Sequence, residues 1–209
     1  MMYDTSIRNR QLFLLYVSVM LIVTFLQQEF VLLPELQNID IVGEESRLLI
    51  LDKYQKWRWF TYLLPPILLS IRLSLVSLCF LIGSFFFQEM SGKKFKEWWG
   101  VSIKAQAVIL AYSVLLCAIN LSIGADEVMS LSKYTSLLCL GHDDMEQWLK
   151  MPLSAINVFE IAYWMVMSLL VSKLVGTNFG KSFKFVMSSY GVGYLFYIAL
   201  LMFLMLYLA

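Results

Sequence analysis

Charged residues are scarce in this chain. Asp, Glu, Lys and Arg make up 15% of the 209 residues, whereas hydrophobic residues make up 60%. A soluble domain carries about 25% charged and 45–50% apolar residues. The uncharged residues are concentrated in long runs, so the composition excludes an ordinary soluble globular domain and points to the membrane.

Residues that carry catalytic and metal chemistry are also few. The three cysteines have no CxxC spacing, and the chain has no HExxH, GxSxG or glycine-rich phosphate loop. The single histidine, His142, stands beside Asp143, Asp144 and Glu146, which invites a metal hypothesis. A solvated acidic loop explains this cluster better. We therefore expect no enzyme activity, no metal site and no cofactor.

Five apolar stretches are long enough to cross a bilayer. The first follows Arg8 and Arg10 and has no small-residue cleavage site after it, so we interpret it as an uncleaved signal anchor. The predicted fold is all-α, a polytopic transmembrane helix bundle forming a single integral membrane domain over residues 1–209. The spans are predicted at residues 11–30, 60–87, 101–123, 155–175 and 185–208, with extracytoplasmic loops at 31–59 and 124–154.

Charge predicts the orientation of the bundle. With the amino terminus inside, the inner face carries nine Lys or Arg against three Asp or Glu, a net charge of +6. The outer face carries six against eleven, a net charge of −5. Basic residues close to span ends favour the cytoplasmic side. We expect a cytoplasmic amino terminus and a carboxyl terminus outside.

The outer end of the second span combines aromatic residues with prolines. Trp57 and Trp59 are placed to lie at headgroup level. Pro65 and Pro66 supply no backbone N–H and are expected to kink or begin the helix. Residues 47–57 before them suggest a short helix lying at the interface.

Two charges of opposite sign fall inside predicted spans, Arg72 in the second and Glu160 in the fourth. A charge at membrane depth costs roughly 2.5–3.5 kcal/mol on insertion scales, which favours a partner. Arg72 lies roughly 18 Å into its span and Glu160 roughly 8 Å, a mismatch of about 10 Å. We hypothesise that they pair directly or through one water. The competing hypothesis places Glu160 in a water-accessible outer vestibule, as a proton or cation site.

Other polar and small residues fall on single faces of the spans, where they favour helix packing over lipid contact. Ser189 and Gly193, for example, stand in a small-xxx-small relation. The expected intramembrane polar residues are Arg72, Glu160, Asn157, Gln106 and Asn120, and the expected helix-packing residues are Ser70, Ser74, Ser77, Ser84, Ser189 and Gly193.

The run NVFEIAYWMVMSLLVSKLVGTNFGKSFKFVMSSYGVGYL resembles the end of bacterial members of the Yip-domain family, and GKKFKEWWGVSIKAQAVIL is similar in style to that family's turn into its middle span. The resemblance covers roughly residues 91–200. It implies a five-span, membrane-organising protein with its amino terminus inside. The signatures of the eukaryotic members are absent or reduced to Tyr190-Gly191, so their trafficking function is not carried over.

Five spans without an internal repeat do not favour a stand-alone transporter. We expect a non-catalytic subunit or scaffold of a larger complex in a bacterial inner membrane, in export or envelope assembly. Its expected partners are the lipid bilayer and other integral membrane proteins, with no nucleic acid and no identifiable small-molecule substrate. The alternative is a small transporter or channel subunit that uses Arg72 and Glu160 along a polar path.

Overall fold

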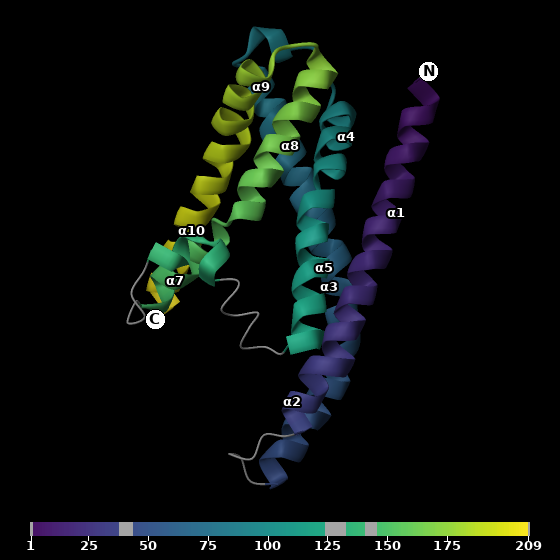
Figure 1. Cartoon of the computed structure of the whole chain (residues 1–209), viewed down its shortest axis with the longest axis vertical. Helices are drawn as coiled ribbons and strands as arrows, with labels where there is room; N and C mark the ends of the chain where they lie inside the picture. The colour runs from purple at the N-terminus through teal and green to yellow at the C-terminus, as the bar shows by residue number, and fades with distance from the viewer. Residues whose placement is uncertain (1, 38–43, 124–132, 141–145, 209) are drawn as a thin grey trace. The chain divides into compact units, whose positions relative to one another are not determined.

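The computed structural model describes residues 2–37, 44–123, 133–140 and 146–208, and their regular structure is helical (Figure 1). One isolated antiparallel bridge joins Ser136 and Asn157. The α-helices are α1 (Met2–Gln27), α2 (Leu33–Gln37), α3 (Glu44–Ser84), α4 (Phe95–Ala105), α5 (Ala107–Ile123), α7 (Gln147–Ala155), α8 (Val158–Val175), α9 (Phe179–Val186) and α10 (Val192–Leu208). The described residues also contain two π-helices, η1 (Gln28–Leu32) and η4 (Met187–Gly191), and two 3₁₀ turns, η2 (Gln88–Met90) and η3 (Leu137–Leu140).

Five of these helical stretches are long and apolar enough to cross a membrane, which confirms the all-α fold and the number of candidate spans. They run over Arg8–Leu32, Leu48–Ser84, Phe95–Ser122, Val158–Val175 and Phe179–Tyr207. Five apolar helices of this length indicate an integral membrane protein.

The second span differs most from its predicted bounds. Its helix, α3, has 41 residues and begins at Glu44, so most of the loop expected at 31–59 is helical. Pro65 and Pro66 lie inside α3 and do not begin it, and the Pro66 carbonyl accepts a hydrogen bond from the Ser70 hydroxyl at 2.8 Å. Such local donors let transmembrane helices tolerate proline. The helix ends at Ser84, so residues 85–87 lie beyond it.

Helix α3 is too long to lie wholly in lipid. At 1.5 Å per residue it spans about 61 Å, against a hydrocarbon core of about 30 Å. Trp57 and Trp59 are both exposed, and their position at headgroup level stays a prediction. Residues 47–57, expected to form a separate interfacial helix, are instead continuous with the rest of α3.

The other spans differ from their predicted bounds by smaller shifts. The third begins earlier, at Phe95, and is interrupted at Gln106 between α4 and α5. The fourth begins at Val158, and the fifth begins at Phe179 because α9 continues through η4 into α10. Part of the loop expected at 124–154 contains η3 and most of α7.

The chain divides into two compact units. Unit 1 comprises Met1–Arg72 with Leu110–Val128, and unit 2 comprises Leu73–Ile109 with Met129–Ala209. Unit 1 brings α1, η1 and α2 together with the first part of α3 and most of α5. Unit 2 contains the end of α3, α4, and all of the chain from η3 onward.

The core of unit 2 is aromatic. The rings of Phe80 on α3, Trp98 on α4 and Phe185 on α9 contact one another, with centroids 5.4–5.6 Å apart, and all three side chains are fully buried. Tyr163 and Met167 of α8 belong to the same buried cluster. Aromatic contacts of this kind add about 0.5–1.5 kcal/mol per pair beyond the burial of area.

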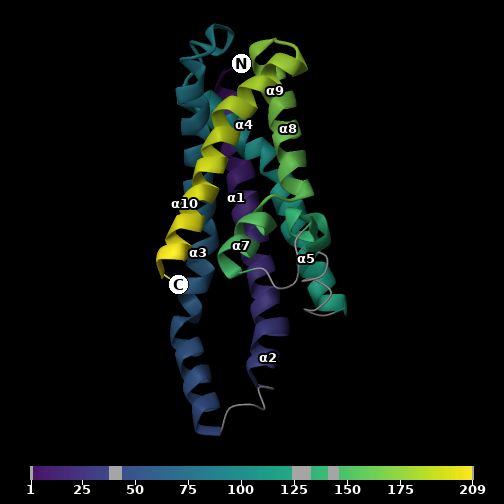
Figure 2. The same cartoon turned by 90° about the vertical axis from the view of Figure 1, so that its left-hand side faces the viewer.

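Local sequence signals shape the hairpin between α8 and α9, which lies at one end of both views (Figures 1 and 2). Gly176 takes a positive φ of 80° and its N–H bonds to the Ser172 carbonyl at 2.8 Å, which ends α8. Asn178 then caps α9 by accepting the Lys181 N–H at 2.9 Å. These signals place α9 back against α8.

Candidate functional site: two polar clusters

The first cluster centres on Glu160 in unit 2. Asn157 caps α8, and its Oδ1 accepts the backbone N–H of Glu160 at 2.8 Å. This cap fixes the start of the helix and places the Glu160 side chain in the first turn. The positive end of the helix dipole favours an acidic residue there.

The Glu160 side chain is only 4% exposed and is held by donors from two helical segments. Its Oε1 accepts a hydrogen bond from the Tyr190 hydroxyl at 2.7 Å and one from Trp164 Nε1 at 3.1 Å. Trp164 lies one turn along α8, whereas Tyr190 belongs to the π-helix η4. The carboxylate therefore joins α8 to the last span.

Aromatic rings surround this carboxylate. Tyr190 meets Tyr163 and Trp164 edge-on, at centroid distances of 5.8 and 6.4 Å. Trp164 also meets Tyr194 of α10 edge-on at 5.9 Å, and the Tyr194 hydroxyl donates to the Ala155 carbonyl at 2.7 Å. We name Glu160, Trp164, Tyr190 and Tyr194 the Glu160 cluster.

The small residues of unit 2 lie where helices approach closely. A Cβ added at Gly83 of α3 would lie 2.5 Å from the Ser189 Cβ, and one added at Gly193 would lie 3.0 Å from the Cys79 sulfur. Each helix thus contributes two small residues four positions apart. Small side chains at such spacing let transmembrane backbones approach one another.

Serines connect α3 with α4. Ser77 is fully buried, donates to the Leu73 carbonyl at 2.6 Å and lies 3.2 Å from the Ser102 hydroxyl. Ser84 is also buried and donates to the Leu81 carbonyl at 2.6 Å.

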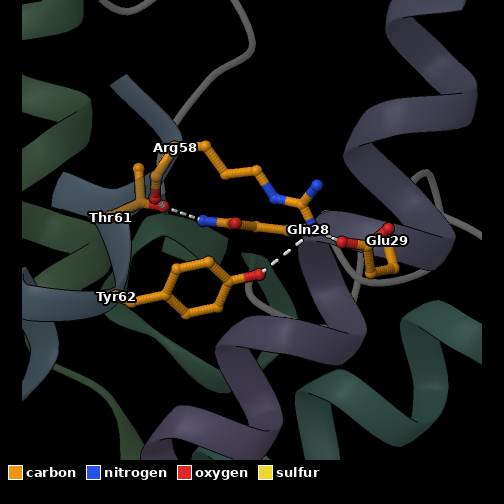
Figure 3. Close-up of polar contacts among 5 residues, drawn as sticks. All are labelled: Gln28, Glu29, Arg58, Thr61 and Tyr62. Carbon is orange, nitrogen blue, oxygen red and sulfur yellow. Dashed lines mark hydrogen bonds and ion pairs between the residues drawn. The ribbon is translucent and has the colours of Figure 1, made fainter. Parts of the chain in front are cut away.

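The second cluster lies in unit 1, between η1 and α3 (Figure 3). The Arg58 guanidinium forms an ion pair with the Glu29 carboxylate and reaches the Tyr62 hydroxyl at 3.5 Å. The Gln28 side-chain amide donates to the Thr61 hydroxyl, which donates in turn to the Arg58 carbonyl at 2.6 Å. We name these five residues the Glu29 cluster.

The orientation of Gln28 follows from the Thr61 hydroxyl. Since that hydroxyl gives its proton to the Arg58 carbonyl, it can only accept from Gln28, so Gln28 must present its NH₂ group. The Gln28 Oε1 is then directed elsewhere, and it is buried with no hydrogen-bond partner among the described residues. A buried acceptor of this kind favours a bridging water.

Sequence reasoning did not find the Glu29 cluster. Glu29 and Arg58, 29 residues apart in the sequence, are among the charges predicted on the outer face, and nothing in their spacing pairs them. The available signal was the spacing of Tyr54, Arg58 and Thr61, which places a polar stripe on one face of α3. That stripe does not identify its partner on η1.

Unit 1 also contains a pocket of about 210 Å³ between α1, α3 and α5. Thr24, Gln27 and Ser113 supply its polar lining, and the rest is apolar. Nearby on α5, the Cys117 sulfur lies 3.9 Å from the Val23 carbonyl. The mixed lining suits a small amphiphilic or hydrated occupant more than a fully charged one.

The remaining predicted polar and packing residues lie outside the two polar clusters. Arg72, Ser70 and Ser74 are half-buried on α3. Gln106 is buried between α4 and α5 and Asn120 is half-buried on α5, and neither side-chain oxygen has a hydrogen-bond partner in the described ranges.

Arg72 ends unit 1, whereas Glu160 lies in unit 2, so their pairing stays a prediction. His142, Asp143 and Asp144 fall outside the described residues. Within the described ranges, no group of three or more His, Cys, Asp or Glu side chains is placed to hold a metal.

No family model, curated protein or solved structure matches this chain. The resemblance to the Yip-domain family therefore stays a prediction that rests on the quoted residues.

Proposed function

We propose that this protein is a non-catalytic subunit or scaffold of a larger membrane complex. The observation that carries the proposal is the setting of Glu160, which is 4% exposed and accepts hydrogen bonds from Tyr190 and Trp164 of its own fold. A carboxylate held in this way joins helices. Polar side chains in transmembrane bundles commonly serve this purpose.

The outward faces of the spans support the same proposal. In the five candidate spans, between 11% and 39% of the residues of the most apolar window are buried within the chain, and the first span is the least covered. On α10, Phe196, Phe203 and Tyr207 are all strongly exposed. Such faces are available to lipid and to helices of other proteins.

The proposal extends to orientation and location. A cytoplasmic amino terminus is supported by the net charges of +6 and −5 on the two predicted faces. A bacterial inner membrane and a role in export or envelope assembly are supported by the resemblance to bacterial Yip-domain proteins, which implies a membrane-organising role.

The experiment is affinity purification of the tagged protein in lipid nanodiscs, followed by cross-linking and mass spectrometry. We expect a stoichiometric integral membrane partner. The variant F196A/F203A on α10 is expected to weaken its retention, whereas I161A/M165A, a less exposed apolar pair on α8, serves as the control. Recovery of the chain alone, as monomer or homo-oligomer, would contradict the proposal.

One observation favours the alternative of a small transporter or channel subunit. The pocket of unit 1 is lined by Thr24 and Gln27 of α1 and by Ser113 of α5, so this unit contains polar surface between two of its helices. In this alternative Arg72 and Glu160 act along a polar path. Loss of ion flux in proteoliposomes for R72Q, with assembly intact, would support it over the scaffold.

A further inference from the structure

We propose that one end of unit 2 binds the headgroups of anionic phospholipids through a cluster of lysines, with two phenylalanine rings inserted beside them. Two turns meet at this end, the α3–α4 turn and the α8–α9 turn, and both views show them together (Figures 1 and 2). An ion pair between Glu89 and Lys181 joins the two turns. The basic rim consists of Lys93, Lys94, Lys96, Lys173, Lys181 and Lys184.

The charge of this rim is largely uncompensated. Only two acidic residues, Glu89 and Glu97, lie in the same turns. Both are engaged locally, Glu89 by Lys181, and Glu97 by Lys93 at 3.8 Å and by the Lys94 backbone N–H at 2.8 Å.

Four lysines therefore remain for an external anion. They are exposed, and none forms an ion pair with a carboxylate in the part of the chain that the structure describes. These four are Lys94, Lys96, Lys173 and Lys184.

The aromatic residues beside the lysines favour a bilayer over an acidic protein as the partner. Phe85 and Phe86 follow the end of α3 and are 80% and 82% exposed. Phenyl rings in this position are unfavourable in water, whereas the membrane interface accepts aromatic rings level with basic side chains. An acidic protein surface would engage the lysines but would leave this apolar pair unexplained.

The rim is held by ordered turns. Met90 of η2 is buried, and Phe87 packs edge-on against Phe185 at 5.4 Å, which holds the α3–α4 turn against α9. In the other turn, the Thr177 and Ser182 hydroxyls lie 2.9 Å apart. The lysines thus project from a preformed surface, so little ordering is needed on binding.

The test is native mass spectrometry of the full chain in detergent with equal amounts of phosphatidylglycerol and phosphatidylcholine. We expect phosphatidylglycerol adducts to exceed phosphatidylcholine adducts by about tenfold. K94Q/K96Q/K173Q/K184Q is expected to bring the ratio close to one. The matched control K53Q/K56Q/K133Q/K150Q removes the same charge elsewhere and is expected to keep the preference. F85S/F86S is expected to lower retention of both lipids without changing their ratio.

Three results would overturn the proposal. The wild-type chain could show no headgroup preference, which would leave the rim to an acidic protein partner. The control could lose the preference as fully as the rim variant, which would make net charge the cause. If the rim variant does not fold, a salt titration of the wild-type chain decides instead, since a preference unchanged between about 0.05 M and about 0.5 M salt excludes exposed lysines as its source.

Discussion

Each of the two polar clusters holds a carboxylate that is largely removed from water, but the partners of the two carboxylates differ. In unit 2 the Glu160 carboxylate is 4% exposed and accepts hydrogen bonds from a phenol and an indole. In unit 1 the Glu29 side chain is 24% exposed and meets the Arg58 guanidinium, whose side chain is 34% exposed. Neutral donors surround the more buried carboxylate, and the partly solvated one has a full ion pair. Desolvating two charges is costlier than desolvating one, which explains the difference.

The clusters share one backbone feature. Glu29 belongs to the π-helix η1, and Tyr190, the phenol donor to Glu160, belongs to the π-helix η4. A π turn holds one residue more than an α turn, so it rotates the following side chains around the helix axis. In both units a π-helix therefore carries a polar side chain to a neighbouring helix.

Charge reversal at Arg72 and Glu160 is expected to have the largest effect if the two residues pair. In that case each single variant, R72E or E160R, should lose about 3–5 kcal/mol because the buried site at position 160 then holds an unpaired charge. The double variant should then recover folding yield and thermal stability in detergent. Recovery would make Glu160 a member of an ion pair, whereas no recovery would exclude the pairing.

Removal of the Glu160 carboxylate tests whether its hydrogen bonds with the neutral donors Tyr190 and Trp164 stabilise the fold. E160A should destabilise the fold by about 2–4 kcal/mol because the Tyr190 hydroxyl and the Trp164 N–H lose their shared acceptor. E160Q retains an acceptor oxygen and should lose less. The measurement is equilibrium unfolding in mixed micelles, with E89A at the exposed Lys181 pair as a control expected near zero. Equal losses for E160A and E89A would contradict the structural role of Glu160.

Close packing between α3 and η4 can be tested at Gly83. G83A should cost about 1–3 kcal/mol, because the new methyl group would lie 2.5 Å from the Ser189 Cβ. The added variant S189G should restore most of this loss. G180A on α9 is the matched control, since its nearest side-chain neighbour is 3.8 Å away. If G83A leaves the melting temperature unchanged, the two helices do not approach closely here.

The Glu29–Arg58 pair is expected to have the smallest effect on stability. A double-mutant cycle with E29Q and R58Q should give a coupling energy of about 0.2–1 kcal/mol, because both side chains are partly solvated. The coupling should fall as salt is raised. A salt-independent coupling above about 3 kcal/mol would place this pair in a fully desolvated site instead.

The spans themselves could be predicted from the sequence with little error in number. Long uncharged runs leave no alternative to helices in lipid, because every backbone N–H and C=O must be satisfied within the segment. Their ends were harder to predict. Residues 47–57 were predicted to form a separate short helix at the interface, whereas in the structure α3 continues through them without a break.

The polar partners could not be predicted in the same way. Asn157 was expected on the Glu160 face from helical spacing, and the structure makes it the cap of α8. Tyr190 lies thirty residues beyond Glu160 along the chain, and its hydroxyl reaches the carboxylate through the turn of α9 against α8 and the π-helix η4. Neither the cap at Asn157 nor the contact between Tyr190 and Glu160 produces a periodic pattern in the sequence.

Hydropathy and length act locally within each segment, so the sequence was enough to predict an all-helical chain with five helices long and apolar enough to cross a membrane. The contacts of Glu29 with Arg58, of Glu160 with Tyr190 and Trp164, and of Gly83 with Ser189 became known from the tertiary structure. These contacts depend on the rotation and spacing of separate helices. Packing between helices sets their rotation and their spacing, and the sequence of one helix alone determines neither.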